Sequence, residues 1–281
     1  RMTALGNSPQ SFKMVDAFGF SHIGNVRPAN EDHFLVGTLS RSLELRHTNL
    51  QGAPALEGSH RAMAHLFVVA DGVGGVAGGH LASGEAVRAL TEYIGLATSC
   101  FYSTAVEAEQ EFIEQLERAV ARADQRVKEY APKGRGPATT LTMAILVGER
   151  AYIVHVGDSR GYHYRAGRLR QFTQDQTMGE LMVDEGVMTE EQAQKAGLNH
   201  VLSGAIGSEY TPSIGVLDLQ LGDILLLCTD GLTKHVADEN IAAILKQSKK
   251  SEAACNQLVD EALDRGGTDN VTAIVARMIP S

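Results

Sequence analysis

Four apolar segments of strand length each carry an aspartate at one end, and this pattern constrains the fold more than any other feature. Three of them, LFVVADG, AYIVHVGDS and DILLLCTDG, end near Asp71, Asp158 and Asp230, whereas in GGTDNVTAIVA Asp269 precedes the apolar run. Short apolar runs bounded by glycine are typical of strands that are buried on both faces. If the strands are antiparallel neighbours, the reversed order at Asp269 brings its carboxylate to the same sheet edge as the other three.

The rest of the chain alternates between strand and helix patterns. Apolar residues at helical spacing occur in the segments 81–97, 104–130, 240–245 and 252–263. Strand-like segments occur at 18–23, 140–146, 151–156, 162–164, 169–172, 223–229 and 271–278. Ser251 is expected to cap the last helix and Gly266 to end it, while residues 1–15 are expected to form a loose lead-in and 39–65 an irregular loop. Hairpins and helices in this order predict an α+β sandwich of antiparallel sheets.

The composition excludes several classes of protein. A chain of 281 residues that is 43% apolar can bury one large core. The net charge of -9, without any basic run, indicates neither a nucleic-acid partner nor attraction to an acidic membrane surface. No apolar run approaches the roughly 20 residues that a membrane helix needs. The three cysteines form no CxxC pair, so a zinc site or disulfide framework is not indicated and we expect a cytoplasmic protein.

Clustered carboxylates point to a metal site. Four carboxylates at one edge would repel one another strongly without cations, and Mg²⁺ and Mn²⁺ prefer carboxylate, carbonyl and water oxygens. The alternative is four unrelated turns, because Asp-Gly is a common turn pair. The segment GNVRPANEDHF adds Arg27, Glu31 and Asp32. Alone it is typical of a surface loop with a local ion pair, but beside a metal cluster the planar fork of Arg27 suits phosphate oxygens.

Five short motifs follow one another along the chain and together suggest a family. They are Arg27-x-x-x-Glu31-Asp32, Asp71-Gly72, Gly157-Asp158-Ser159-Arg160, Thr229-Asp230-Gly231 and Gly267-Thr268-Asp269-Asn270. This series resembles that of the PP2C (PPM) metal-dependent protein serine/threonine phosphatases, in their bacterial-type branch, over roughly 18–278. The resemblance implies a four-layer αββα sandwich, in which two antiparallel sheets are flanked by helix pairs, as a single domain over residues 16–281.

The resemblance also implies an activity and its metal ligands. The expected reaction is hydrolysis of phosphoserine and phosphothreonine on proteins by a metal-activated water, without a covalent intermediate. Two Mn²⁺ or Mg²⁺ ions are implied, with Asp71 bridging both, Gly72 offering its backbone carbonyl, and Asp230 and Asp269 binding the first ion. Asp158 resembles the ligand of a third, weaker ion.

Further roles follow from the same resemblance. Glu31 and Asp32 are expected to act on the metals through water, with Asp32 as a base that orients the nucleophile. Arg27 is expected to hold the substrate phosphate, and Asn270 to support the metal site. The polar segment 177–200, whose Thr189-Glu190-Glu191-Gln192 predicts a capping box, corresponds to a flap beside the active site or to an ordinary surface helix.

The expected partners are phosphorylated proteins and a cognate Ser/Thr kinase pathway, with the chain acting as a monomer. Two other functions stay open. One is a catalytically silent phosphoprotein-binding module on the same fold. The other is a nucleotide-binding oxidoreductase, because residues 72–77 fit GxGxxA, although Asp71 interrupts the junction between strand and glycines. Val73 stands where many eukaryotic members have a histidine, which leaves the general acid unassigned.

Overall fold

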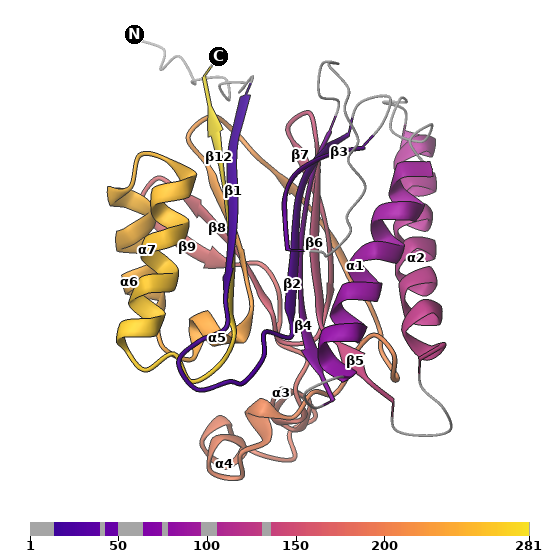
Figure 1. The fold of residues 1–281 in the computed structure, drawn as a ribbon, viewed down its shortest axis with the longest axis vertical. Helices are drawn as coiled ribbons and strands as arrows, with labels where there is room; N and C mark the ends of the chain where they lie inside the picture. The colour runs from indigo at the N-terminus through magenta and orange to yellow at the C-terminus, as the bar shows by residue number, and fades with distance from the viewer. Residues whose placement is uncertain are drawn as a thin grey trace, which may run out of the picture.

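Two antiparallel sheets pack face to face in the computed structural model, which describes residues 14–39, 43–49, 64–74, 78–96, 106–130 and 136–280 (Figure 1). One sheet runs in the order β1-β12-β11-β8-β9 and consists of β1 (Met14–His22), β8 (Arg160–Arg165), β9 (Arg168–Gln171), β11 (Ile224–Cys228) and β12 (Val271–Ile279). The other runs in the order β10-β7-β6-β4-β2-β3 and consists of β2 (Asp32–Leu39), β3 (Leu43–Thr48), β4 (Ala64–Val73), β6 (Leu141–Val147), β7 (Arg150–Val156) and β10 (Ser213–Asp218), with β5 (Ala138–Thr139) paired to the end of β4.

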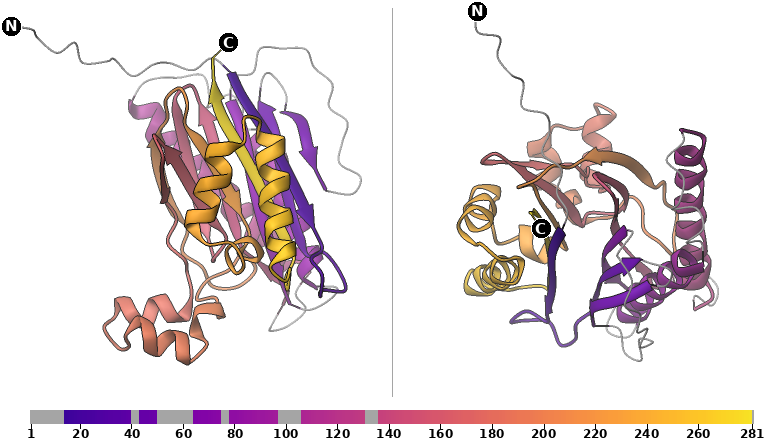
Figure 2. Two further views of the ribbon diagram at one scale, coloured as in Figure 1. Left: turned by 90° about the vertical axis from the view of Figure 1, so that its left-hand side faces the viewer. Right: turned by 90° about the horizontal axis from the view of Figure 1, so that it is seen from above.

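Helices cover the outer face of each sheet, which gives four layers (Figures 1 and 2). The helices α1 (Gly78–Leu96) and α2 (Val106–Lys128) lie on the sheet that contains β4, and α6 (Asp238–Gln247) and α7 (Ser251–Asp264) lie on the sheet that contains β11. The one-turn helix α5 (Asp230–Thr233) follows β11 directly. This arrangement confirms the predicted αββα sandwich.

Each layer boundary is closed by an apolar core. The stripe expected on α2 is buried, from Phe112 to Val127, and packs with α1 against β4 and β6. A second cluster packs α6 and α7 onto β8, β11 and β12. A third fills the space between the two sheets, where Phe67 of β4 and Leu225 of β11 belong to the same buried cluster. Burial on both faces explains why these strands read as continuous apolar runs.

The strand ends that carry the aspartates meet at one end of the sandwich. Asp32 and Asp71 are opposite one another in the antiparallel pair β2–β4. In the other sheet β11 and β12 are antiparallel, with Cys228 opposite Ala273, so the residue after β11 and the residues before β12 lie together. The reversed order of Asp269 therefore brings it to the same end as the other three aspartates, as predicted. However, the four come from both sheets rather than from the edge of one.

Some expectations about individual elements are wrong. The segment 39–65 was expected to be a loop, but β3 lies within it; residues 40–42 and 50–63 are outside the described residues. Residues 32–34, the start of β2, were expected to be part of a polar loop, and β10 was not expected at all. The strand β1 begins at Met14, inside the expected lead-in, while residues 1–13 are outside the described residues.

The two caps expected for α7 have different outcomes. Ser251 is the first residue of the helix rather than its cap: its hydroxyl donates to Asp16 O at 2.6 Å. The amide of Ser251 donates instead to Asp16 Oδ2 at 2.8 Å, so a side chain of β1 caps this helix. Gly266 ends the helix as predicted, with φ of 131° and its amide donating to Leu263 O.

The segment 177–200 projects from the end of the sandwich at which the aspartates meet (Figures 1 and 2). It contains α3 (Met178–Asp184), α4 (Glu190–Lys195) and the short 3₁₀ helix η2 (Leu198–His200). The capping box of α4 is present, because the Gln192 amide donates to Thr189 Oγ1 and the Thr189 amide donates to Gln192 Oε1. None of the helices in the described residues is long and apolar enough to span a membrane.

Candidate metal centre

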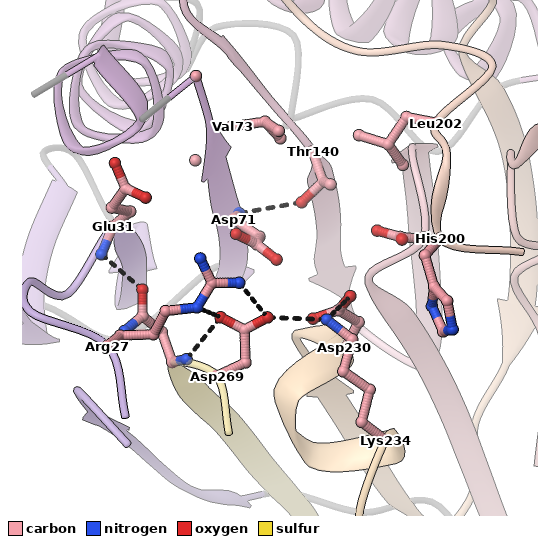
Figure 3. Close-up of a pocket in the computed structure, with 14 residues that line it drawn as sticks. Arg27, Glu31, Asp71, Val73, Thr140, His200, Leu202, Asp230, Lys234 and Asp269 are labelled. Atoms are coloured by element: carbon pink, nitrogen blue, oxygen red, sulfur yellow. Dashed lines mark hydrogen bonds and ion pairs between the residues drawn. The ribbon is translucent and has the colours of Figure 1, made fainter. Parts of the chain in front are cut away.

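The structure brings most of the expected site residues to one cavity of about 250 Å³ at the end of the sandwich (Figure 3). Among the residues that line it are Arg27, Glu31, Asp71, Gly72, Asp158, Asp230, Asp269 and Asn270. Asp32 does not line the cavity; it is buried behind it, opposite Asp71. The four aspartates that end the apolar strands are thus not unrelated turn residues.

Asp71 is held by its backbone, which leaves the carboxylate directed into the cavity (Figure 3). Its amide donates to Thr140 Oγ1 at 2.9 Å, and its carbonyl accepts from the Thr139 hydroxyl and the Thr140 amide, both at 2.9 Å. Burial, followed by the neighbouring carboxylates of Asp32 and Asp230, raises the pKa of Asp71 well above its usual range. A positive charge bound in this cavity would therefore be strongly favoured.

Gly72 lies where no side chain fits. A Cβ built on it would be 2.1 Å from Gly79 O and 2.8 Å from Glu31 O, and both of these atoms belong to the backbone. The Gly72 amide donates to Glu31 O at 3.2 Å, which joins the end of β4 to the segment before β2. The glycine therefore allows the start of α1 and the Glu31 segment to approach Asp71 closely.

Asp32 connects the two sheets. It is 1% exposed, and its Oδ2 accepts from the hydroxyls of Thr229, which directly follows β11, at 2.8 Å and of Thr272 in β12 at 2.7 Å. Its Oδ1 is buried and has no hydrogen-bond partner among the residues that the structure describes. Burial raises the pKa of Asp32 to about 7, against the lowering effect of the two hydroxyl groups. Oδ2 of Asp32 is thus fixed by two hydroxyl groups, whereas Oδ1 can still accept a hydrogen bond.

Asp269 and Asp230 form ion pairs with two basic side chains, Arg27 and Lys234. Asp269 accepts from Arg27, with Nε to Oδ1 and Nη2 to Oδ2 both 2.8 Å, and its Oδ2 lies 2.8 Å from Lys234 Nζ. Lys234 Nζ also lies 2.6 Å from Asp230 Oδ2, whereas Asp230 Oδ1 is buried and unpartnered. Burial alone would raise the pKa of Asp269, but Lys234 and Arg27 lower it below its usual value.

Asn270 positions the loop that carries Arg27 and Glu31. Its side-chain amide donates to Ile23 O at 2.8 Å and to Ala29 O at 2.9 Å, and its Oδ1 accepts from the Glu31 amide at 2.9 Å. These bonds fasten the loop between β1 and β2 to the start of β12. The carboxylate of Glu31 is left with a buried, unpartnered Oε1.

Asp158 lies at the edge of the same site. It follows Gly157, whose φ of 105° turns the chain after β7. Burial, then the charges of Asp230 and Asp175, raise the pKa of Asp158 to about 7, whereas Lys234 acts in the opposite direction. Asp158 also lines an adjoining cavity of about 250 Å³, together with Asp230, Lys234 and residues of the segment 177–200.

The donor set fits hard divalent cations. In the described part of the chain no three Asp, Glu, His or Cys side chains are already arranged as a metal-ligand group. Asp230 and Asp269 are instead engaged by Lys234 and Arg27. However, three buried carboxylate oxygens have no partner: Glu31 Oε1, Asp32 Oδ1 and Asp230 Oδ1. Orphaned buried carboxylate oxygens require a cation or a proton, and an all-oxygen set favours Mg²⁺ or Mn²⁺.

Sequence reasoning missed several residues of the site. Lys234 lies four residues after Asp230, and this i,i+4 spacing of opposite charges could have indicated the pair. Thr140 and His200 also line the cavity, but their sequence contexts carry no comparable signal. The hydroxyl partners of Asp32, Thr229 and Thr272, are 197 and 240 positions away in the sequence.

The sequence matches the family described as Protein phosphatase 2C over residues 51–272. The serine/threonine protein phosphatase PstP of Mycobacterium tuberculosis (strain ATCC 25618 / H37Rv) is 36% identical over 227 residues, which are 79% of this chain and 42% of PstP. This chain thus spans less than half of the length of that relative. The serine/threonine phosphatase stp of Listeria monocytogenes serovar 1/2a is 30% identical over 82% of this chain and 90% of its own length.

A similar solved structure has the same architecture. It is the catalytic domain of the serine threonine protein phosphatase PstP in complex with 2 manganese ions, with a TM-score of 0.71 and 31% identity over 94% of this chain and 98% of that one. The family match spans most of this sequence, and the geometry of the site agrees with it. The nucleotide-binding alternative loses its basis, because Gly72 and Val73 belong to β4 and pair with β5. The chain belongs to the protein phosphatase 2C family.

Proposed function

We propose that this chain hydrolyses phosphoserine and phosphothreonine on proteins with the help of divalent metal ions. The observation that carries the proposal is the meeting of Asp71, Asp230 and Asp269 with Arg27 at one cavity. The relatives named as serine/threonine phosphatases support the same activity.

The carboxylates of Asp71, Asp230 and Asp269 and the carbonyl of Gly72 would hold two Mn²⁺ or Mg²⁺ ions, as the manganese complex of PstP supports. When bound, such ions lower the pKa of water and neutralise charge on the phosphoryl oxygens. Glu31, with its unpartnered Oε1, would contact the metals through water. Asp158 would serve a third ion from the edge of the cavity.

Asp32 and Arg27 would act on the reactants. Asp32 Oδ1 is the oxygen that Thr229 and Thr272 leave unpartnered, and from behind the cavity it would act on the metals through water and orient the attacking water. The side chain of Arg27 is 48% exposed, and its guanidinium would bind the phosphate with two parallel N–H groups after exchanging its contact with Asp269. Asn270 would position Arg27 by holding the loop before β2 through its bonds to the carbonyls of Ile23 and Ala29.

The wider setting belongs to the same proposal. The substrates would be phosphoproteins produced by a Ser/Thr kinase pathway, and the chain would act as a monomer in the cytoplasm, as one domain over residues 16–281. The segment 177–200 would be a flap beside the site, because His200 at its end lines the cavity, as does Leu202 two residues further on. Val73 carries no titratable proton and is not the general acid.

Phosphate release from a phosphothreonine peptide and a phosphoserine peptide tests the proposal. We expect release with Mn²⁺, loss of release with excess EDTA, and recovery when Mn²⁺ is restored. A fluorescence-anisotropy titration with the same labelled peptides runs in parallel. Peptide binding without release, from folded protein in Mn²⁺ and in Mg²⁺, would contradict the proposal and favour the catalytically silent binding module.

A further inference from the structure

Lys234 is placed by the backbone in the middle of the carboxylate site. It follows α5 directly, and its amide donates to Asp230 O at 2.8 Å, so its side chain extends along the same helical turn as Asp230. Its ammonium group lies 2.6 Å from Asp230 Oδ2 and 2.8 Å from Asp269 Oδ2 (Figure 3). The side chain is only 27% exposed, unlike a lysine that extends into solvent.

The ammonium lies in the gap that an ion shared by Asp230 and Asp269 would need. Both oxygens of Asp269 are already occupied: Oδ1 accepts from Arg27 and from the Asn270 amide, and Oδ2 accepts from Arg27 and Lys234. Among the described residues, Asp230 Oδ1 has no partner. A divalent cation that binds both carboxylates must therefore displace a positive charge, and the one that bridges them is Lys234.

Lys234 also lines the adjoining cavity, whose other lining residues include several carboxylates. The adjoining cavity is lined by Lys234 and by three further acidic side chains, those of Asp158, Asp175 and Glu180. Arg160 already forms a bidentate pair with Asp175, at 2.7 to 3.0 Å. Asp158 is the buried carboxylate of this set, and it already interacts electrostatically with Lys234. A displaced ammonium would thus move toward Asp158.

We propose that Lys234 is a tethered cation that competes with the divalent ion for Asp230 and Asp269. It neutralises the two carboxylates until the ion binds, and then moves toward Asp158. The inference rests on the proposed function, because it concerns the same carboxylates. Its consequence is that this chain binds its metal more weakly than the carboxylates alone would allow.

Isothermal titration of Mn²⁺ into the metal-stripped protein, without substrate, tests this competition. Lys234→Met removes the charge and keeps much of the length of the side chain. We expect it to bind Mn²⁺ roughly tenfold more tightly than the wild type, because the ion no longer has to break a charge-assisted hydrogen bond. Lys234→Arg, which keeps the charge, should remain near the wild-type affinity.

A matched control is available in α2. Lys128 forms an i,i+4 pair of 2.8 Å with Asp124, whose side chain is 13% exposed, close to the 17% of Asp230. Lys128→Met removes one charge from an i,i+4 pair outside the cavity and should leave the Mn²⁺ affinity unchanged. If Lys234→Met destabilises the stripped protein, its melting temperature should rise more on adding Mn²⁺ than that of the wild type.

The outcomes separate the two proposals. Equal or weaker Mn²⁺ binding by Lys234→Met, together with Mn²⁺-dependent phosphate release by the wild type, would overturn the competition and leave the phosphatase intact. Tighter binding by Lys234→Met, without phosphate release from any variant, would support the competition and refute the proposed function.

Discussion

Replacing Gly72 by alanine tests whether close backbone approach shapes the site. The new Cβ would meet Gly79 O at 2.1 Å, Gly79 C at 2.3 Å and Glu31 O at 2.8 Å. Ordinary contact needs about 3.5 Å, so the start of α1 must move away from β4 by roughly 1 Å or more. Overpacking of this kind costs about 1–3 kcal/mol, and we expect the upper end because the obstructing atoms are backbone. For a domain of this size, about 3 kcal/mol corresponds to a melting temperature lower by about 6–12 °C.

Thermal unfolding followed by circular dichroism, in EDTA so that metal binding does not contribute, measures this effect. Gly215→Ala is the matched control: a Cβ there meets nothing within 4 Å, and we expect its stability to stay the same or rise by up to about 1 kcal/mol. Because Gly72 is next to Asp71, the variant should also lose phosphate release at a temperature where it is folded. A Gly72→Ala protein as stable as Gly215→Ala would refute the reasoning.

Two further predictions concern Arg27 and His65. Arg27→Lys should lower kcat/KM for a phosphothreonine peptide by roughly tenfold or more, mainly through KM, because an ammonium cannot replace a bidentate guanidinium. Steady-state kinetics at saturating Mn²⁺ check this prediction. Unchanged kinetics would refute the phosphate-binding role of Arg27. Burial lowers the pKa of His65 from 6.5 to about 4. The unfolded chain therefore binds the proton first as pH falls. The free energy of unfolding should decrease between pH 6.5 and 4, by up to about 3 kcal/mol from this residue. Urea unfolding at several pH values checks this, and a His65→Gln protein with an equally steep decrease would contradict it.

The sequence was most informative where the local pattern and the tertiary structure have the same cause. A strand buried on both faces needs an apolar run that ends where the chain turns, so Asp71, Asp158 and Asp230 could be located from the local sequence pattern. The antiparallel pairing of β11 and β12 then fixes Asp269 beside Asp230. The helical stripe of α2 was predictable for the same reason, because one of its faces is buried.

The sequence was least informative where a polar residue is buried in a strand and its hydrogen-bond partners are distant in the sequence. The strand β2 reads as a polar loop because it begins with Asp32 and His33, but both are buried. Oδ2 of Asp32 accepts from Thr229, which follows β11, and the His33 ring bonds to Ser83 of α1 at 2.9 Å. Such partners cannot be identified from spacing. The cap of α7 is a further case, since its acceptor comes from β1.

The central claim is that the carboxylate of Asp71, at the end of β4, holds the metal on which hydrolysis depends. The most direct test is kcat for a phosphothreonine peptide at saturating Mn²⁺, measured for the wild type, Asp71→Asn and the exposed control Asp264→Asn. The account predicts that Asp71→Asn loses more than about a hundredfold in kcat, because even residues that only support a metal ligand cost about 10- to 100-fold, while Asp264→Asn stays at the wild-type rate. A folded Asp71→Asn protein that retains the wild-type kcat would contradict the account.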